Sequence, residues 1–110
     1  MTCGAAGGLN IILKTILDPG NEVIVVAPYF VEYLFYIDNH GGTPVIVSSD
    51  PTTFQLDIEE LEKNITKDTK AIILNSPNNP TGIIYSEEVL SELNELIVRK
   101  GREFNTQIYI

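Results

Sequence analysis

The sequence predicts an α/β fold, a three-layer α/β/α sandwich with a mainly parallel sheet. Short, nearly continuous runs of β-branched residues are typical of strands buried on both faces, as in a parallel sheet. Segments with apolar residues at helical spacing separate these runs, which lie at 22–27, 45–47 and 71–74. Because parallel strands need a crossover connection, this alternation indicates one sheet covered by helices on both faces.

The first half of the chain is expected to contain two helices and two strands. From Leu9 onward, apolar residues recur at i, i+3, i+4, i+7 and i+8, which predicts one buried helix face. An Asp-Pro-Gly turn at 18–20 ends this helix, and two glycines at 41–42 end the next one. The expected elements are a helix over 5–17, a strand over 22–27, a helix over 31–40 and a strand over 45–47.

The second half repeats the alternation. Asp57 with Glu60 three residues later resembles a capping box at the start of a helix. Ser86 is expected to cap a second helix, whose end is marked by the basic residues before Gly101. The expected elements are a helix over 57–65, a strand over 71–74, a helix over 86–101 and a strand over 107–110.

The composition excludes several classes of protein. The net charge is −8 with only seven Lys and Arg residues, which argues against a nucleic-acid partner. The single cysteine, Cys3, can form neither an internal disulfide nor a Cys-rich zinc site. No apolar run reaches the ~20 residues of a membrane helix, and the start lacks the features of a signal peptide. We therefore expect a cytoplasmic protein that binds neither nucleic acid nor membrane.

Two segments carry candidate binding groups. Residues 4–8, Gly-Ala-Ala-Gly-Gly, stand where the unpaired N–H groups and dipole of a helix start attract phosphate. Their spacing matches neither the dinucleotide fingerprint nor a nucleotide P-loop, and a helix start packed closely on the sheet is the alternative. Residues 76–82, Ser-Pro-Asn-Asn-Pro-Thr-Gly, follow the carboxyl end of a strand, where open α/β sheets place ligands. An ordinary turn is the alternative there.

Other polar residues are weaker candidates for chemistry. The only histidine, His40, is expected to be solvated or to cap a helix end. Cys3 is expected to be a small packed residue rather than a nucleophile. The acidic residues at 59, 60 and 62 are expected to form a solvated helical face.

The order of the motifs resembles one known family. Residues 71–82 are similar to the strand and Asn-Pro-Thr-Gly loop of fold-type I aminotransferases of the aspartate aminotransferase class. Residues 16–23 and 27–30 resemble the Asp-Pro-Gly turn, strand and Pro-Tyr-aromatic loop of the same family, and the glycine-rich turn precedes both. The resemblance implies that residues 1–110 are part of a large domain that binds pyridoxal 5′-phosphate (PLP), without a second domain.

The resemblance also implies roles for individual residues. Gly4, Ala5 and Ala6 would hold the PLP phosphate, and Phe30 would stack on the pyridine ring. Asn79 would donate a hydrogen bond to the 3-oxygen of the cofactor and lie near the substrate carboxylate. Many relatives have Ser, Thr or Lys in the phosphate turn and Trp at the aromatic position, so this chain offers only backbone donors and a smaller ring there.

Several functional residues of the family match nothing in this chain. These are the lysine linked covalently to PLP, the Asp at the pyridine nitrogen, the Tyr near the 3-oxygen and the Arg that binds the substrate carboxylate. The chain is therefore expected to be an inactive fragment with no catalytic residue of its own. Because it leaves sheet edges and apolar faces uncovered, the fragment is expected to self-associate.

The expected parent is a homodimeric, PLP-dependent aminotransferase that moves an amino group between an amino acid and a 2-oxo acid. A PLP-dependent lyase or decarboxylase of the same fold is an alternative, because one fold hosts several reactions. A non-catalytic α/β interaction domain and a nucleotide-binding α/β domain are alternatives from other classes.

Overall fold

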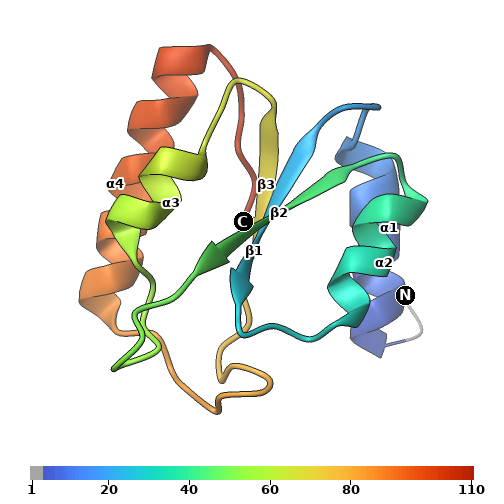
Figure 1. The fold of residues 1–110 in the computed structure, drawn as a ribbon. Coiled ribbons are helices and arrows are strands. Elements are labelled where there is room, and N and C mark those ends of the chain that lie inside the picture. The colour runs from blue at the N-terminus through green and yellow to red at the C-terminus, as the bar shows by residue number, and fades with distance from the viewer. Residues whose placement is uncertain (1–3) are drawn as a thin grey trace.

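Three parallel strands form one sheet with helices on both faces in a computed structural model, which describes residues 4–110 (Figure 1). The strand order is β2-β1-β3, with β1 in the centre. This arrangement confirms the predicted α/β class with a parallel sheet. The expectation for Cys3 lies outside the described residues. The strands are β1 (Glu22–Ala27), β2 (Thr43–Ser48) and β3 (Thr69–Ile73), and the helices are α1 (Gly4–Ile16), α2 (Glu32–Asn39), α3 (Ile58–Asn64) and α4 (Glu87–Phe104).

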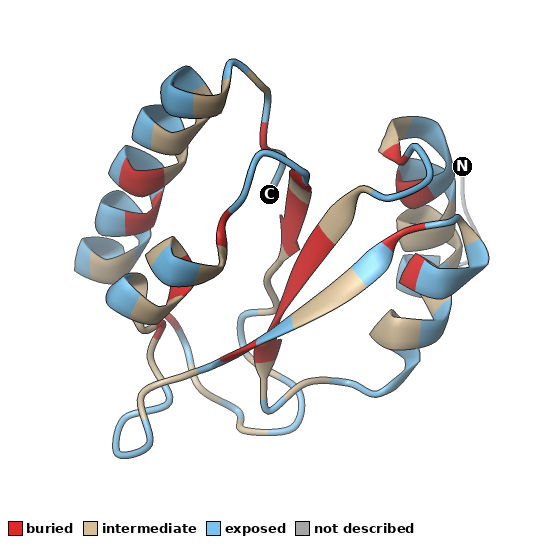
Figure 2. Cartoon of the chain, turned by 45° about the horizontal axis from the view of Figure 1, so that its top comes forward, coloured by how far each residue is buried: buried red, intermediate tan, exposed pale blue. Residues whose placement is uncertain are grey.

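The side chains of β1 divide between two hydrophobic clusters. Val23 and Val25 belong to the cluster of α1 and α2, whereas Ile24 and Val26 belong to the cluster of α3 and α4. Successive side chains of a strand point to opposite faces of the sheet, so an unbroken apolar run fills both layers. Figure 2 shows the buried residues on the strands and on the helix surfaces that face them.

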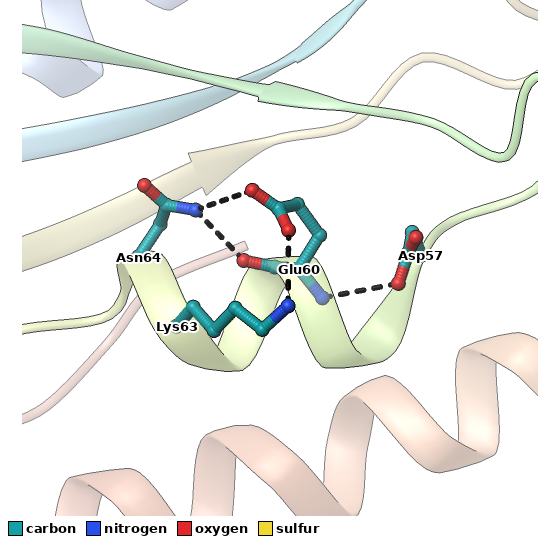
Figure 3. A network of polar contacts seen from close by, with 4 residues as sticks. All are labelled: Asp57, Glu60, Lys63 and Asn64. Atoms are coloured by element: carbon teal, nitrogen blue, oxygen red, sulfur yellow. Dashed lines mark hydrogen bonds and ion pairs between the residues drawn. The ribbon is translucent and has the colours of Figure 1, made fainter.

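Side chains cap two helices as predicted. Asp57 accepts a hydrogen bond from the Glu60 amide at 3.0 Å, and Ser86 accepts one from the Val89 amide at 3.2 Å. The Glu60 carboxylate faces Asn64 and Lys63 instead of reaching back to Asp57 (Figure 3). Only half of the expected capping box is therefore formed.

The acidic residues of α3 lie at the surface, where the side chains of Glu60 and Glu62 are 40% and 39% exposed, and Glu62 also contacts α4. Glu62 accepts a hydrogen bond from Arg99 of α4 at 2.7 Å, and the Lys100 ammonium lies 3.9 Å from the same carboxylate oxygen. This contact with Arg99 lowers the pKa of Glu62. The acidic residues on this face thus help to join the two helices.

The predicted end of the last helix is wrong. Helix α4 continues past Gly101 to Phe104 and ends at Asn105, which adopts the left-handed conformation (φ 50°, ψ 50°). A β-carbon at Gly101 would lie 3.0 Å from the Thr106 carbonyl oxygen. The glycine therefore permits close approach of the chain that follows the helix, and it does not end the helix.

The predicted fourth strand is present only as a single bridge. Tyr109 pairs in parallel with Ala71 of β3. The Tyr109 amide donates to the Lys70 carbonyl, and the Ile72 amide donates to the Tyr109 carbonyl, both at 2.9 Å. The last residues thus extend the sheet beside β3 in the expected direction.

The packing of α4 predicts that alanine substitution of two leucines in this helix lowers the free energy of unfolding by different amounts. Leu93 is buried at 1% exposure, whereas Leu90 is 40% exposed. Leu93→Ala is expected to lower the free energy of unfolding by about 2–5 kcal/mol, because it leaves a cavity in the core. Leu90→Ala is the matched control and is expected to cost less than about 1 kcal/mol. Urea unfolding measures both, and equal costs would contradict the assigned packing of α4.

Candidate functional site

The start of α1 and the loops after the strands lie at the same end of the molecule, the lower end in Figure 1. All three strands are parallel, so their carboxyl ends meet at one edge of the sheet. The loop after β1 contains Phe30, and the loop after β3 contains Asn79. The fold therefore brings the three predicted binding segments to one end of the sheet.

The first turn of α1 consists of small residues. Gly4 adopts a positive φ of 71°, and a β-carbon there would meet no atom of the described residues 4–110 within 4 Å. Gly4, Ala5 and Ala6 are all exposed, and the turn contains no acidic residue. The N–H groups of a first turn have no acceptor within the helix, and the helix dipole favours an anion beside them. This surface can accept a phosphate group.

A contact between two helices supports that turn. The Asn10 side chain donates to the Ala6 carbonyl at 2.8 Å, and its oxygen lies 3.0 Å from His40 Nε2. His40 is the residue after the last turn of α2 and is half-buried. As the C-cap residue of α2 it has the predicted capping role, and its side chain also links the end of α2 to α1.

Phe30 lies in the loop that follows β1. Its ring packs edge-on against Tyr33, with 5.8 Å between the ring centroids and 80° between the planes. The residue is 36% exposed. The contact with Tyr33 holds the ring while part of its surface stays open to a flat ligand.

The two adjacent asparagines in the loop after β3 have different environments. The Asn78 side-chain oxygen accepts from the Thr81 hydroxyl at 3.1 Å and faces the Thr81 amide at 3.4 Å. Asn79 is exposed, and its side chain has no hydrogen-bond partner within residues 4–110. Asn79 is thus the one of the two whose neutral amide is open to a ligand.

Tyr85 anchors the same loop in the hydrophobic core. Its ring is 6% exposed and packs in the cluster of α3 and α4. Asn78 Nδ2 donates to its hydroxyl at 3.4 Å. Burial raises the pKa of Tyr85, the bond from Asn78 lowers it, and the nearby Tyr33 raises it again. Tyr85 therefore remains a neutral phenol at physiological pH.

Gln55, in the loop between β2 and α3, holds the segment around Tyr85. Its side-chain Nε2 donates to the Ile84 carbonyl, and its side-chain Oε1 accepts from the Ser86 backbone amide, both at 3.0 Å. Sequence reasoning missed this residue, because the two partners are 29 and 31 positions away. Asn78 was also missed as an internal anchor, although Asn side chains commonly bond to groups a few residues further along in a turn.

Other features of the described structure lie away from this edge. An apolar hollow of about 480 Å³ between α1 and β3 contains none of the predicted site residues. Among residues 4–110, no group of three His, Cys, Asp or Glu side chains could hold a metal ion. No helix in that range is long and apolar enough to cross a membrane.

Comparison with protein families decides the relationship. The model of the family "Aminotransferase class I and II" matches residues 1–103. The chain belongs to this family. Aminotransferases of class I and II use PLP, and the predicted family resemblance is confirmed.

Similar proteins include aminotransferases of bacteria. A probable aspartate/prephenate aminotransferase of Thermus aquaticus is 46% identical over 100 residues, which are 90% of this chain and 26% of the relative. The aspartate aminotransferase of Bacillus subtilis is 44% identical over 94 residues, 84% of this chain and 24% of the relative. This aminotransferase chain thus spans about a quarter of the length of the curated relatives it matches.

Solved aminotransferases have the same fold over this range. An amino transferase of Eubacterium rectale superposes with a TM-score of 0.95 at 40% identity, covering 97% of this chain and 27% of that one. The aspartate aminotransferase of Thermus thermophilus with maleate has a TM-score of 0.79 at 41% identity, covering 92% and 26%. The arrangement of strands and loops described above is therefore that of the family.

The chemistry of this edge fits the cofactor of the family. The side-chain-poor turn at Gly4 leaves room for a phosphate, the partly exposed Phe30 ring suits a flat heterocycle, and Asn79 offers a neutral amide. None of these residues carries a charge that would repel an anionic ligand.

The raised pKa of Tyr85 predicts a loss of stability in alkali. Tyr85 keeps its proton in the folded state above the ordinary tyrosine pKa of 10.0, whereas the unfolded chain loses it there. Its contribution is fully present below that value and is lost as the pH rises through the folded-state pKa. Urea unfolding between about pH 8 and about pH 11 measures this decline. Tyr85→Phe is expected to show a smaller decline over the same interval, and an equal decline would contradict the burial of the phenol.

Proposed function

We propose that this chain forms one wall of the PLP site of an aminotransferase that moves an amino group between an amino acid and a 2-oxo acid. The observation that carries the proposal is the exposed Asn79 amide at the carboxyl edge of the sheet, with the first turn of α1 at the same end of the molecule. Family membership supports the cofactor and the reaction class.

Each binding segment has one task in this proposal. The backbone amides at Gly4, Ala5 and Ala6 hold the phosphate through hydrogen bonds and the helix dipole. Phe30 packs on one face of the pyridine ring and keeps water from it. Asn79 donates to the 3-oxygen and lies near the substrate carboxylate. When bound, PLP supplies the electron-accepting ring on which amino-group transfer depends.

The covalent chemistry belongs to residues of the whole protein outside this chain. No lysine here stands in a motif like that of the lysine linked to PLP, and the same holds for the arginine that binds the substrate carboxylate. The relatives are named as aminotransferases, which favours amino-group transfer over lyase or decarboxylase chemistry.

The substrate remains a class rather than one amino acid. Similar proteins are named for aspartate and prephenate, and an alanine aminotransferase of Pyrococcus furiosus is 33% identical with a TM-score of 0.83. The homodimer and the cytoplasmic location follow from the family resemblance and the composition, and they stay predictions.

The aromatic wall can be tested by PLP titration of the full-length protein that carries these residues. Phe30→Ala is expected to raise the dissociation constant for PLP about two- to tenfold, the range of an aromatic ring contact. Phe35→Ala is the matched control, because Phe35 is also exposed but lies on α2, outside the loop after β1. An equal effect of the two substitutions would contradict the role of Phe30.

The isolated 110-residue chain is expected not to transaminate, because it has no lysine in the required motif. Mixing it with PLP, an amino acid and a 2-oxo acid tests this, with the full-length protein as the positive control and circular dichroism to confirm folding. Turnover that depends on a lysine of the isolated chain would contradict the expectation.

A further inference from the structure

The turn between β3 and α4 is organised around Asn78. The Asn78 amide donates to the Ile83 carbonyl at 2.7 Å, and the Asn78 carbonyl accepts from the Gly82 amide at 2.7 Å. Its side-chain oxygen accepts from the Thr81 hydroxyl at 3.1 Å, and that hydroxyl also accepts from the Ile83 amide at 3.2 Å. One residue therefore closes the turn through both its backbone and its side chain.

The same residue connects the turn to the hydrophobic core. Asn78 Nδ2 donates to the hydroxyl of Tyr85, whose ring is 6% exposed. The Tyr85 amide in turn donates to the Ser76 hydroxyl at 3.2 Å, and Gln55 bonds the backbone on both sides of Tyr85. The turn is therefore attached to a part of the molecule that cannot shift without disturbing the core.

Asn79 adds no side-chain bond to this arrangement. It is exposed and flanked by the residue that closes the turn and by Pro80, whose ring restricts the backbone. A loop with a mobile Asn79 would lose more conformational entropy when a ligand is bound, so a fixed turn favours binding.

We propose that Asn78 is a positioning residue for Asn79: its side chain fixes the turn so that the neighbouring amide is held at the edge of the sheet for the cofactor and substrate. Asn78 acts through Asn79 and does not touch the ligand. This inference rests on the proposed function, since it assumes that Asn79 binds PLP.

The test uses the full-length protein freed of its cofactor and titrated with PLP. Asn78→Ala, Asn79→Ala and the double variant are compared with wild type, and Asn94→Ala on the exposed surface of α4 is the matched control. Two quantities are measured: the dissociation constant for PLP and the pH at which the absorption of the bound cofactor changes. Loss of a neutral donor disfavours the ionised form of the 3-oxygen. The pH of the absorption change is therefore expected to rise.

Asn79→Ala is expected to weaken PLP binding about tenfold or more, the range of a hydrogen bond to a charged group. Asn78→Ala is expected to weaken it about two- to tenfold and to shift the absorption change in the same direction. In the Asn79→Ala background, Asn78→Ala is expected to add less than about twofold, because residues that act through one another are not additive. Asn94→Ala is expected to change neither quantity.

The other outcomes separate the two proposals. If Asn79→Ala leaves both quantities unchanged, Asn79 is not a ligand of PLP, and the proposed role of this edge is wrong. If Asn79→Ala weakens binding but Asn78→Ala has no effect, or has its full effect in the double variant, the positioning role is overturned. Should Asn78→Ala fail to fold, Tyr85→Phe decides in its place, because it removes the hydroxyl partner and keeps the ring in the core. Tyr85→Phe is then expected to weaken PLP binding about twofold or more in the protein that keeps Asn79, and to have a smaller effect in the Asn79→Ala variant. Equal effects in these two proteins overturn the proposal.

Discussion

Burial of β1 on both of its faces is the constraint on which the rest of the structure depends. Residues 23–26 are at most 5% exposed, and alternate side chains enter opposite hydrophobic clusters. Such a strand must lie between neighbours in the sheet and between helices above and below it. The parallel pairing with β2 and β3 follows, and with it the meeting of the strand ends at one edge. The position of the binding segments is thus a consequence of core packing.

A strand end brings a loop to the edge, but it does not fix the loop's conformation. Loops with small and polar residues are usually mobile. Here Tyr85 inserts into the core, and Gln55 crosses from the loop after β2 to bond the backbone beside it. Phe30 is held in a similar way by its edge-on contact with Tyr33. The candidate site is therefore preorganised by contacts that begin in the core and end at the exposed groups.

Local signals in the sequence predicted most of the fold, and contacts between distant residues account for the errors. The apolar runs and the caps at Asp57 and Ser86 act within a few residues, so they can be recognised without a structure. The length of α4 could not be predicted, because the glycine inside it is explained by the Thr106 carbonyl oxygen on the returning chain. Likewise, two adjacent asparagines look equivalent in the sequence and differ only once Asn78 is bonded within the turn.

The chemical character of the edge indicates what this part of the protein can do. Its backbone amides, a phenyl ring and a carboxamide can bind and orient a ligand, but none of these groups exchanges a proton near neutral pH. The buried phenol of Tyr85 has a raised pKa, so it stays protonated near neutral pH and is not available as a base there. Amino-group transfer requires a group that accepts and returns a proton at the substrate carbon. In the proposed function such a group comes from a segment outside residues 1–110, and the edge described here would hold the cofactor in place while that group acts.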